Sequence, residues 1–220
     1  SLEQYNQPSK TVVNENDRKS EEVFCRSIIS FGQLLLHTYR IHLQRENLND
    51  FEGTFHVNRL ITVFKKMEER NNSHEIKRFF HLLWDVRYVF DKYIIKWISD
   101  VDTKSESLEL MNFNRNQDGY YSRSKYEKSA SLMLQSVLYF TGDYLRQYWL
   151  TPNLKYLIEN HQNLNATSKE HLQYLERLDN VFSTTENVTD KELSWNLMFV
   201  HNYKLGSSDF EKYLKRSLGT

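Results

Sequence analysis

Three residues have the types and the spacing to begin a metal site: His74, His81 and Asp85. Steps of seven and four residues place them on one face of a helix. Imidazole nitrogens and a carboxylate are ligands that zinc and other divalent transition metals accept. A stable site needs another ligand from elsewhere, and the sequence holds no histidine pair of the H-x-x-x-H kind. We therefore predict solvated residues on a polar helix face, and no metal site beyond these three candidate ligands.

A second stretch, residues 114–128, has the composition of a nucleic-acid contact. It interleaves cations with tyrosines, and the residues concerned are Arg115, Tyr120, Tyr121, Arg123, Lys125, Tyr126 and Lys128. Cations can neutralise phosphates while tyrosine rings stack on exposed bases. The excess of basic over acidic residues in the stretch is only two. An ordinary polar loop, with its tyrosines packed against the protein, is therefore the competing interpretation.

The stretch "HLLWDVRYVFDKYIIKW", residues 81–97, mixes large apolar side chains with charges. On a helical wheel Arg87 and Asp91 fall inside the apolar arc, one turn apart. The two side chains of such a pair can form charge-assisted hydrogen bonds to each other while apolar neighbours pack around them. We predict a buried structural ion pair here rather than a carboxylate held for catalysis.

Motifs that would indicate an enzyme are absent from the sequence. It has neither a glycine-rich phosphate-binding loop nor a G-x-S-x-G nucleophile elbow. Cys25 lies among apolar residues that predict a helix, so we expect a small core residue there rather than a reactive thiolate. We predict no catalytic residue and no cofactor for this chain.

The composition limits which partners and which cellular compartment can be expected for this protein. The 29 basic and 29 acidic side chains cancel, so no overall field attracts nucleic acid or an anionic membrane. A single cysteine is typical of a reducing compartment, and no uncharged apolar run of about 18 residues exists to span a bilayer. These features favour a cytoplasmic protein that does not contact a membrane.

The chemistry-bearing residues must be positioned mainly by helices, because the chain has only 2 prolines and 6 glycines. Residues 1–19 are polar and without periodicity, and we predict a flexible lead-in there. Helical spacing of apolar residues is found at 21–44, 57–70, 73–99 and 126–149. By composition alone, residues 33–43 could instead form a buried strand. Residues 100–125 are the least regular, with an extended part at 107–113.

Start signals for helices are frequent in the C-terminal half. They comprise Thr151 before Pro152 and three capping-box pairs, Thr167 with Glu170, Thr189 with Glu192 and Ser208 with Glu211, while Gly219 could end the last helix. We predict an all-α fold, a multi-helix bundle with one irregular, partly extended segment near 100–125. It would form one domain over 20–220, or two packed subdomains at 20–99 and 126–220.

Several apolar segments of the sequence resemble the helical middle region of the GmrSD family of modification-dependent restriction endonucleases. They are "FFHLLWDVRYVFDKYIIKW", "SLMLQSVLYFTGDYLRQYWLTPNLKYLIENH", "SIISFGQLLLHTYRIHL" and "FVHNYKL". Members of that family have a nucleotide-hydrolysing domain with a DGQQR-type motif and an HNH-type nuclease domain with an H-x-x-P word. Neither motif occurs in this chain. The resemblance therefore implies a non-catalytic part of a phage-defence protein.

Three hypotheses for function follow. The first, implied by the resemblance, is a helical connector that couples an adjoining NTPase-like domain to a nuclease-like domain of a DNA-cleaving parent protein. The second is a nucleic-acid-binding module, with DNA as the partner, that uses the 114–128 stretch. The third is an enzyme of unrecognised type built on the face that carries His74, His81 and Asp85. We favour the connector.

Overall fold

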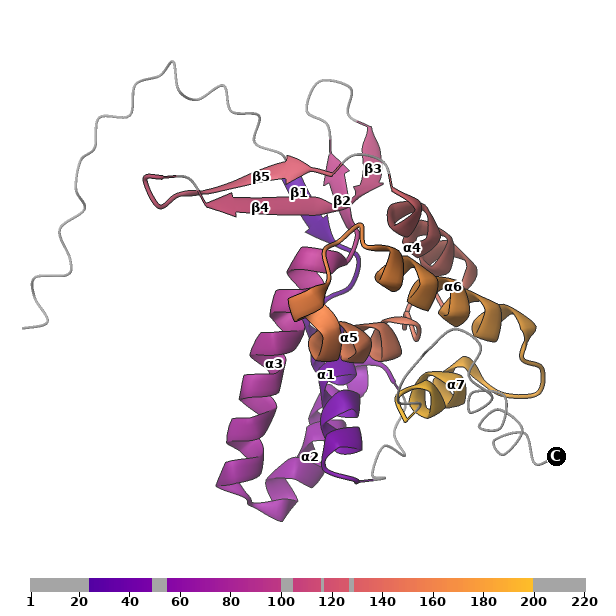
Figure 1. Ribbon diagram of the computed structural model, residues 1–220. Coiled ribbons are helices and arrows are strands. Elements are labelled where there is room, and N and C mark those ends of the chain that lie inside the picture. Colours follow the sequence, from indigo (N-terminus) through magenta and orange to yellow (C-terminus); the bar gives the residue numbers. More distant parts are fainter. Residues whose placement is uncertain (1–23, 49–54, 100–104, 116, 127–128, 200–220) are drawn as a thin grey trace, which may run out of the picture.

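The computed structural model describes residues 24–48, 55–99, 105–115, 117–126 and 129–199. Within these residues the chain forms seven α-helices and two small antiparallel sheets (Figure 1). The fold is therefore mostly helical, as the scarcity of proline and glycine predicts, but the prediction of a purely α-helical protein is wrong. In the described part of the chain no helix is long and apolar enough to cross a lipid bilayer.

The first described helix, α1 (Phe31–Arg45), lies in the middle of the molecule and is buried on nearly every side. Ser30 caps its start at Phe31, and the Ser30 hydroxyl accepts a hydrogen bond from the backbone amide of Gln33. The predicted helix began ten residues earlier, at residue 21. Residues Phe24–Ser27 instead form strand β1, which pairs with a later strand. The alternative of a strand over 33–43 is wrong.

A helical hairpin packs against α1. The 3-10 turn η3 (Val57–Arg59) leads into α2 (Leu60–Arg70), and α3 (Ser73–Tyr93) returns antiparallel to it (Figure 1). Asn71 ends α2 in the left-handed region, with φ of 45°. The Asn72 side chain then accepts hydrogen bonds from the amides of His74 and Glu75 and starts α3. Two consecutive asparagines thus make the sharp reversal.

Helix α3 ends at Tyr93, six residues before the predicted end. Strand β2 (Lys96–Ser99) follows it directly. The Lys96 ammonium folds back on the helix end and donates to the carbonyls of Phe90, Asp91 and Ile94 at 3.3, 2.7 and 3.0 Å. These bonds satisfy carbonyls that a helix end leaves open, and the positive charge suits the helix dipole.

The two sheets occupy the upper part of the molecule in Figure 1. β1, β2 and β3 (Glu106–Glu109) form an antiparallel sheet in that order. β4 (Met111–Arg115) and β5 (Tyr121–Lys125) form a separate hairpin that projects from the body. The predicted extended part near 107–113 is confirmed as strand, whereas the predicted polar loop after it is half of a hairpin.

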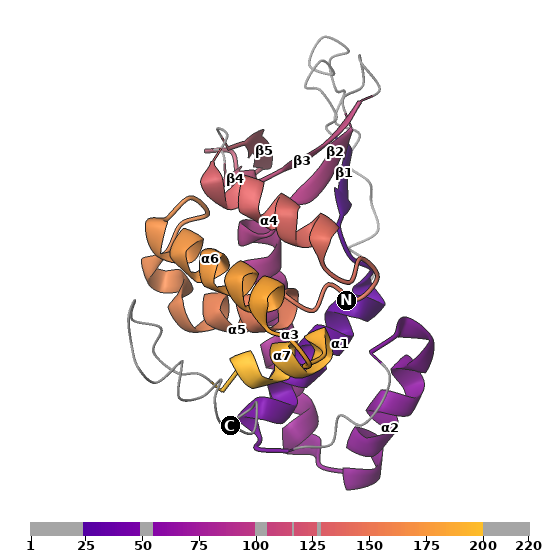
Figure 2. The same cartoon turned by 90° about the vertical axis from the view of Figure 1, so that its right-hand side faces the viewer.

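Four further helices are found in the described part of the chain after β5. They are α4 (Ala130–Thr141), α5 (Leu150–Asn160), α6 (Lys169–Thr184) and α7 (Asp190–Leu197), with a 3-10 turn η4 (His161–Asn163) after α5. α6 packs against both α4 and α5, and α5 packs against α3 (Figure 2). The single helix predicted over 126–149 is interrupted at Gly142. The Asp143 side chain accepts from the amides of Leu145 and Arg146 and stabilises a turn instead.

The predicted helix starts have different outcomes. The capping box of Thr189 and Glu192 is confirmed, with both reciprocal hydrogen bonds present. α5 begins at Leu150, so Thr151 is inside the helix rather than its cap. α6 is preceded by Ser168, one residue later than predicted. The signals at Ser208 and Gly219, and the lead-in at 1–19, lie outside the described residues.

The core consists of two apolar clusters. The larger one combines residues of α1, α3, α4, α5, α6 and α7, and it includes Val86, Leu154 and Leu175. The smaller one lies between α1, α2 and α3 and includes Phe55 and Phe79. The larger cluster thus joins residues of both stretches that the sequence offered as subdomains.

Candidate functional site

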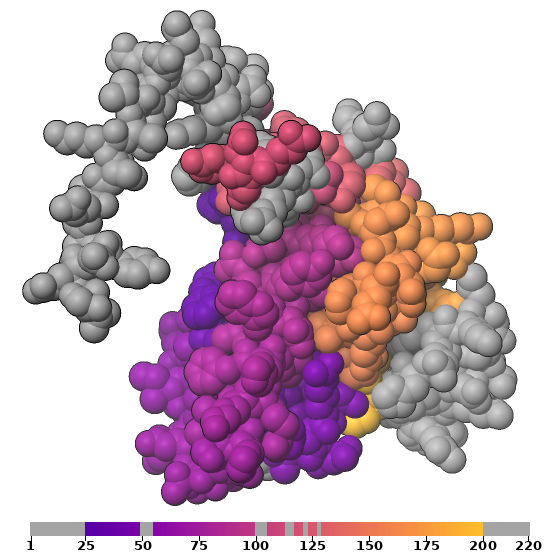
Figure 3. Space-filling view, turned by 60° about the vertical axis from the view of Figure 1, so that its left-hand side comes forward, coloured from indigo at the N-terminus to yellow at the C-terminus, as the bar shows by residue number. Residues whose placement is uncertain are grey.

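The outward face of α3 carries a row of exposed apolar side chains, the α3 ridge: Ile76, Phe80, Trp84 and Tyr88. Trp84 is 79% exposed and Phe80 62%. Because four residues advance a helix by about 400°, the four form one continuous ridge. The face of α3 lies open at the surface in Figure 3. Exposed apolar groups that cluster in this way mark interaction surfaces, and tryptophan and tyrosine are frequent binding hot spots.

Arg87 and Asp91 lie on this exposed side of α3. Their ion pair is present, with Arg87 Nε donating to Asp91 Oδ2 at 2.5 Å. The predicted burial is wrong, because the two side chains are 55% and 34% exposed. Helix α3 buries a narrow face that includes Phe79, Val86 and Tyr93. The wheel placed the pair in the core only because the aromatic residues of the α3 ridge widened the apolar arc.

A second exposed apolar surface, the α4 face, follows α4 into the next turn. It consists of Met133, Val137, Phe140, Tyr144 and Leu145. Met133, Phe140 and Leu145 are all more than 60% exposed. In Figure 1, α3 runs along the left side of the molecule, whereas α4 lies at the upper right. The α3 ridge and the α4 face are therefore separate surfaces on different elements.

A buried charge cluster holds α1, α2 and α3 together. Its centre is Glu75, which accepts from Arg70 Nη2 at 2.7 Å and from Arg70 Nε at 3.0 Å. His42 Nε2 lies 3.2 Å from the same carboxylate, and Arg70 also donates to the Tyr39 hydroxyl at 3.3 Å. The hydrogen bonds from Arg70 hold the pKa of Glu75 below its usual value. The Glu75 carboxylate thus links α1, α2 and α3 through its hydrogen bonds.

Arg40 makes the corresponding link between α1 and α7. Its guanidinium donates to the Lys191 carbonyl at 2.7 Å and to the Ser194 hydroxyl at 3.3 Å. The rings of Phe55, Tyr148 and Trp195 surround it at 5.3, 6.0 and 5.8 Å. Burial lowers the pKa of Arg40 to about 10, so the group is still charged at neutral pH.

Two of the three buried histidines among the described residues, His37 and His171, have neutral hydrogen-bond partners. His37 Nδ1 lies 2.8 Å from the Thr151 hydroxyl, and His171 Nε2 lies 3.0 Å from the Asn153 side-chain oxygen. Burial lowers the pKa of His37 to about 3, with nearby Arg40 acting in the same direction, and burial lowers the pKa of His171 to about 4. Both imidazoles are therefore neutral in the folded chain at neutral pH.

The predicted metal candidates His74, His81 and Asp85 are all exposed on α3. Throughout the described residues there is no group of three histidine, cysteine, aspartate or glutamate residues that could hold a metal ion. Cys25 is half-buried in strand β1, opposite Ile98 of β2, and so is not on a helix as the sequence predicted.

The β4–β5 hairpin contains the predicted nucleic-acid residues. Its register pairs Arg115 with Tyr121 and Phe113 with Arg123, and Lys125 with Met111. Arg123 and Lys125 are exposed, and Tyr120 at the tip is 75% exposed. Lys125 lies 3.9 Å from Glu109, which is a long, partly exposed ion pair. Lys128 lies outside the described residues.

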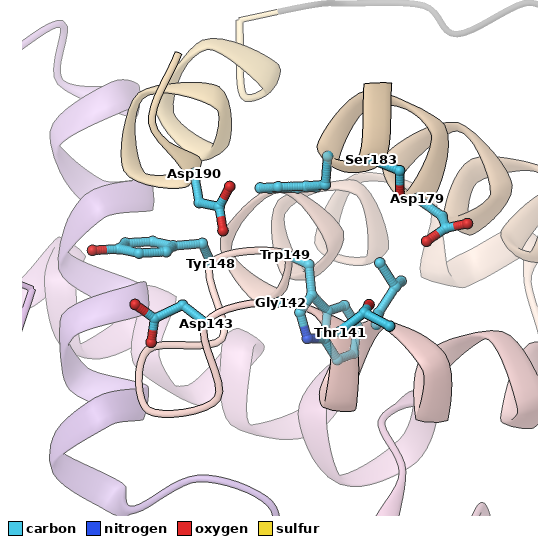
Figure 4. Close-up of a pocket in the computed structure, with 10 residues that line it drawn as sticks. Thr141, Gly142, Asp143, Tyr148, Trp149, Asp179, Ser183 and Asp190 are labelled. Carbon is cyan, nitrogen blue, oxygen red and sulfur yellow. The ribbon is translucent and has the colours of Figure 1, made fainter. Parts of the chain in front are cut away.

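A cavity of about 210 Å³ lies between the end of α4, α6 and α7 (Figure 4). Trp149 and Phe182 supply apolar walls, while Asp143, Asp179 and Asp190 contribute carboxylates. Asp143 is paired with Arg146 at 2.6 Å. Burial and the nearby Asp143 raise the pKa of Asp190. The lining would suit a small cation better than an anion, and no sequence motif indicated it.

Sequence reasoning also missed the two buried networks. In the sequence, nothing distinguishes Glu75 from other acidic residues in the first turn of a helix. Arg40 follows the stretch "LLLHTY". The one signal in the sequence was the position of Arg40 in a largely apolar run, because a cation that is buried requires buried partners. Those partners come from α7, about 150 residues further along the chain and so could not be identified from spacing.

Comparison of the chain with protein-family models, with curated proteins and with solved structures found no match. A functional assignment therefore depends on the surfaces and clusters described above.

Proposed function

We propose that this chain is a non-catalytic helical connector that joins two neighbouring domains of a GmrSD-like phage-defence protein. The observation that carries the proposal is the presence of two separate exposed apolar surfaces, the α3 ridge and the α4 face. A monomer that works alone has little reason to expose aromatic residues on two elements. Each surface is suited to be covered by a different neighbouring domain.

The interior supports this role. The Glu75 cluster fixes α1, α2 and α3 to one another, and Arg40 fixes α1 to α7. The larger apolar cluster then connects α3 with α6 and α7. A displacement imposed on α3 is therefore passed to the C-terminal helices through packed groups, because closely packed interiors transmit strain.

By the resemblance, the neighbours would be an NTPase-like domain and a nuclease-like domain of the parent chain, and the protein would act in the cytoplasm. Hydrolysis and DNA cleavage would belong to those domains. The connector would transmit the state of the first to the second through the α3 ridge and the α4 face.

The test is to uncouple the two activities in the complete parent protein. Trp84→Ser on the α3 ridge and Phe140→Ser on the α4 face should each leave nucleotide hydrolysis unchanged. Each should lower nucleotide-dependent DNA cleavage by about tenfold or more, the loss of one hot-spot contact. Asp85→Ser on α3 and Thr141→Ser on α4 are matched controls, because both residues are exposed and lie beside the substituted aromatic residues.

Loss of both activities together in the Trp84 and Phe140 variants would indicate damage to the parent fold rather than uncoupling. Normal cleavage in both variants would refute the connector. Determining the sequence on both sides of the chain in the parent gene tests the family independently. A DGQQR-type motif upstream and an H-x-x-P word downstream are expected.

A further inference from the structure

The cavity between the end of α4, α6 and α7 has carboxylates on two sides and aromatic side chains in its wall. Figure 4 shows Asp143 and Asp190 on one side and Asp179, which belongs to α6, on the other. Trp149, only 3% exposed, lies between these sides, and Phe182 adds a second aromatic ring to the lining. The volume of about 210 Å³ is smaller than that of drug-sized sites, which begin at about 300 Å³, so the cavity suits a small ligand.

Two of the three carboxylates, Asp179 and Asp190, have no ion-pair partner within the described residues. Asp143 differs from them, because it is paired with Arg146 at 2.6 Å and accepts hydrogen bonds from backbone amides of the turn that follows it. Burial and the nearby Asp143 raise the pKa of Asp190, so the two negative charges on that side repel each other. A positively charged ligand would relieve this repulsion.

The arrangement of the carboxylates fits an elongated cation better than a metal ion. A divalent metal needs several ligand atoms that converge on one point at about 2.0–2.6 Å. Among the described residues, no group of three histidine, cysteine, aspartate or glutamate side chains could hold a metal in this way. Carboxylates on two sides of an aromatic wall instead match a ligand with a cationic group at each end and a hydrocarbon stem. Ammonium groups are also attracted to the faces of aromatic rings.

We propose that this cavity binds a short aliphatic diamine. One ammonium group lies at Asp190, close to the further negative charge of Asp143, and the other lies at Asp179. The hydrocarbon stem packs against Trp149 and Phe182, where the burial of apolar surface adds to the affinity. No residue of the α3 ridge or of the α4 face lines the cavity. Failure of the connector proposal would therefore not remove the diamine site, and the reverse also holds.

The experiment is isothermal titration calorimetry of the whole chain at neutral pH with linear diaminoalkanes of roughly three to seven carbon atoms. We expect one chain length to bind best, because both ammonium groups must reach their carboxylates at once. The monoamine with the same number of carbon atoms should bind at least about tenfold more weakly, the loss of one charge-assisted hydrogen bond. Asp179→Asn and Asp190→Asn should each weaken binding of the best diamine by about tenfold, to the level of the monoamine.

The matched control is Glu176→Gln, which removes a carboxylate from an exposed position of α6 outside the cavity. It should bind the diamine as the original chain does. Asparagine has nearly the shape of aspartate, and thermal unfolding of both asparagine variants checks that they fold. The comparison of diamine with monoamine needs no variant and so tests the site in the original chain. No binding of any diamine, equal binding of diamine and monoamine, an equal loss in Glu176→Gln, or tighter binding of Mg²⁺ than of every diamine would each overturn the proposal.

Discussion

At the scale of single residues, two of the carboxylates of α3 have contrasting surroundings. The side chain of Glu75 is 5% exposed and is hydrogen-bonded to Arg70 and His42, whereas that of Asp91 is 34% exposed and paired with Arg87 alone. We expect Glu75→Ala to lower the free energy of unfolding by about 3–5 kcal/mol, because it leaves partly buried cationic and imidazole groups without their partner. Asp91→Ala should cost less than about 1 kcal/mol.

Urea unfolding of the two variants, followed by circular dichroism, gives this comparison directly. Asp91→Ala serves as the control for removing a carboxylate from the same helix. If the two variants lose similar amounts of stability, Glu75 is not the centre of a buried cluster in solution.

The buried histidines predict a pH dependence of stability, because burial lowers the pKa of His37, His171 and His42. Their pKa values are about 3 for His37 and about 4 for His171 in the folded chain, against about 6.5 in the unfolded chain. Below pH 6.5 the unfolded chain takes up protons that the folded chain does not bind. Stability is therefore complete above pH 6.5 and falls as the pH drops, with each histidine contributing up to about 1.4 kcal/mol per pH unit.

The measurement is the free energy of unfolding in urea between pH 7.5 and pH 5, above the range in which carboxylates titrate. His171→Gln should make the slope shallower by the contribution of one histidine, because the substituted side chain is neutral at every pH while His37 and His42 remain. His81→Gln is the control, since His81 is exposed. An equal slope in the original chain and in His171→Gln would show that His171 is not buried as a neutral group.

At the scale of elements, α3 offers an internal comparison between adjacent phenylalanines. Phe79 is 3% exposed and Phe80 is 62% exposed. Phe79→Ala should cost about 3–5 kcal/mol of stability, the usual loss for a phenylalanine removed from a core. Phe80→Ala should change stability by less than about 0.5 kcal/mol, because Phe80 belongs to the α3 ridge. Thermal unfolding of both variants would test this, and comparable losses would mean that the ridge is buried.

The same helix shows what can and cannot be predicted from sequence. The helix itself is predictable, since apolar residues recur at helical spacing and Asn72 is a good cap. Its exposed side is not predictable, because aromatic residues of the α3 ridge have the same composition as core residues. The strand after Tyr93 was also missed. Its pairing partners, β1 and β3, are short and distant in sequence, so local periodicity contains no sign of them.

At the scale of the whole molecule, the connector proposal requires that catalysis lie elsewhere. We expect the purified chain to unfold in one cooperative transition, because the larger apolar cluster includes residues of α1 and of α7. We also expect it neither to hydrolyse nucleotides nor to cut DNA with added divalent metals. The assay compares the chain with its complete parent under identical conditions. Turnover near the parent's rate would contradict the connector and return attention to His74, His81 and Asp85.

The candidate surfaces were only partly predictable at this scale. The 114–128 stretch could be identified from its cations and tyrosines, since that chemistry is local. The hairpin that contains it depends on strand pairing around the turn at Gly119, which has φ of 84°. The α4 face was assigned to a continuous helix over 126–149, and its exposure follows from how α6 packs on the opposite side. Such packing between distant segments leaves no trace in residue spacing.

The ammonium of Lys96 gives the junction between α3 and β2 a chemical readout. The side chain is 4% exposed and bound to three helix-end carbonyls, so an acylating reagent cannot reach it while the junction is closed. Its rate of acylation, relative to that of an exposed amine such as Lys77, measures how often the end of α3 opens. If the chain is a connector that transmits motion along α3, that motion acts on the junction between α3 and β2. Under the connector proposal, the rate of Lys96 acylation would therefore change when the neighbouring domains change their state.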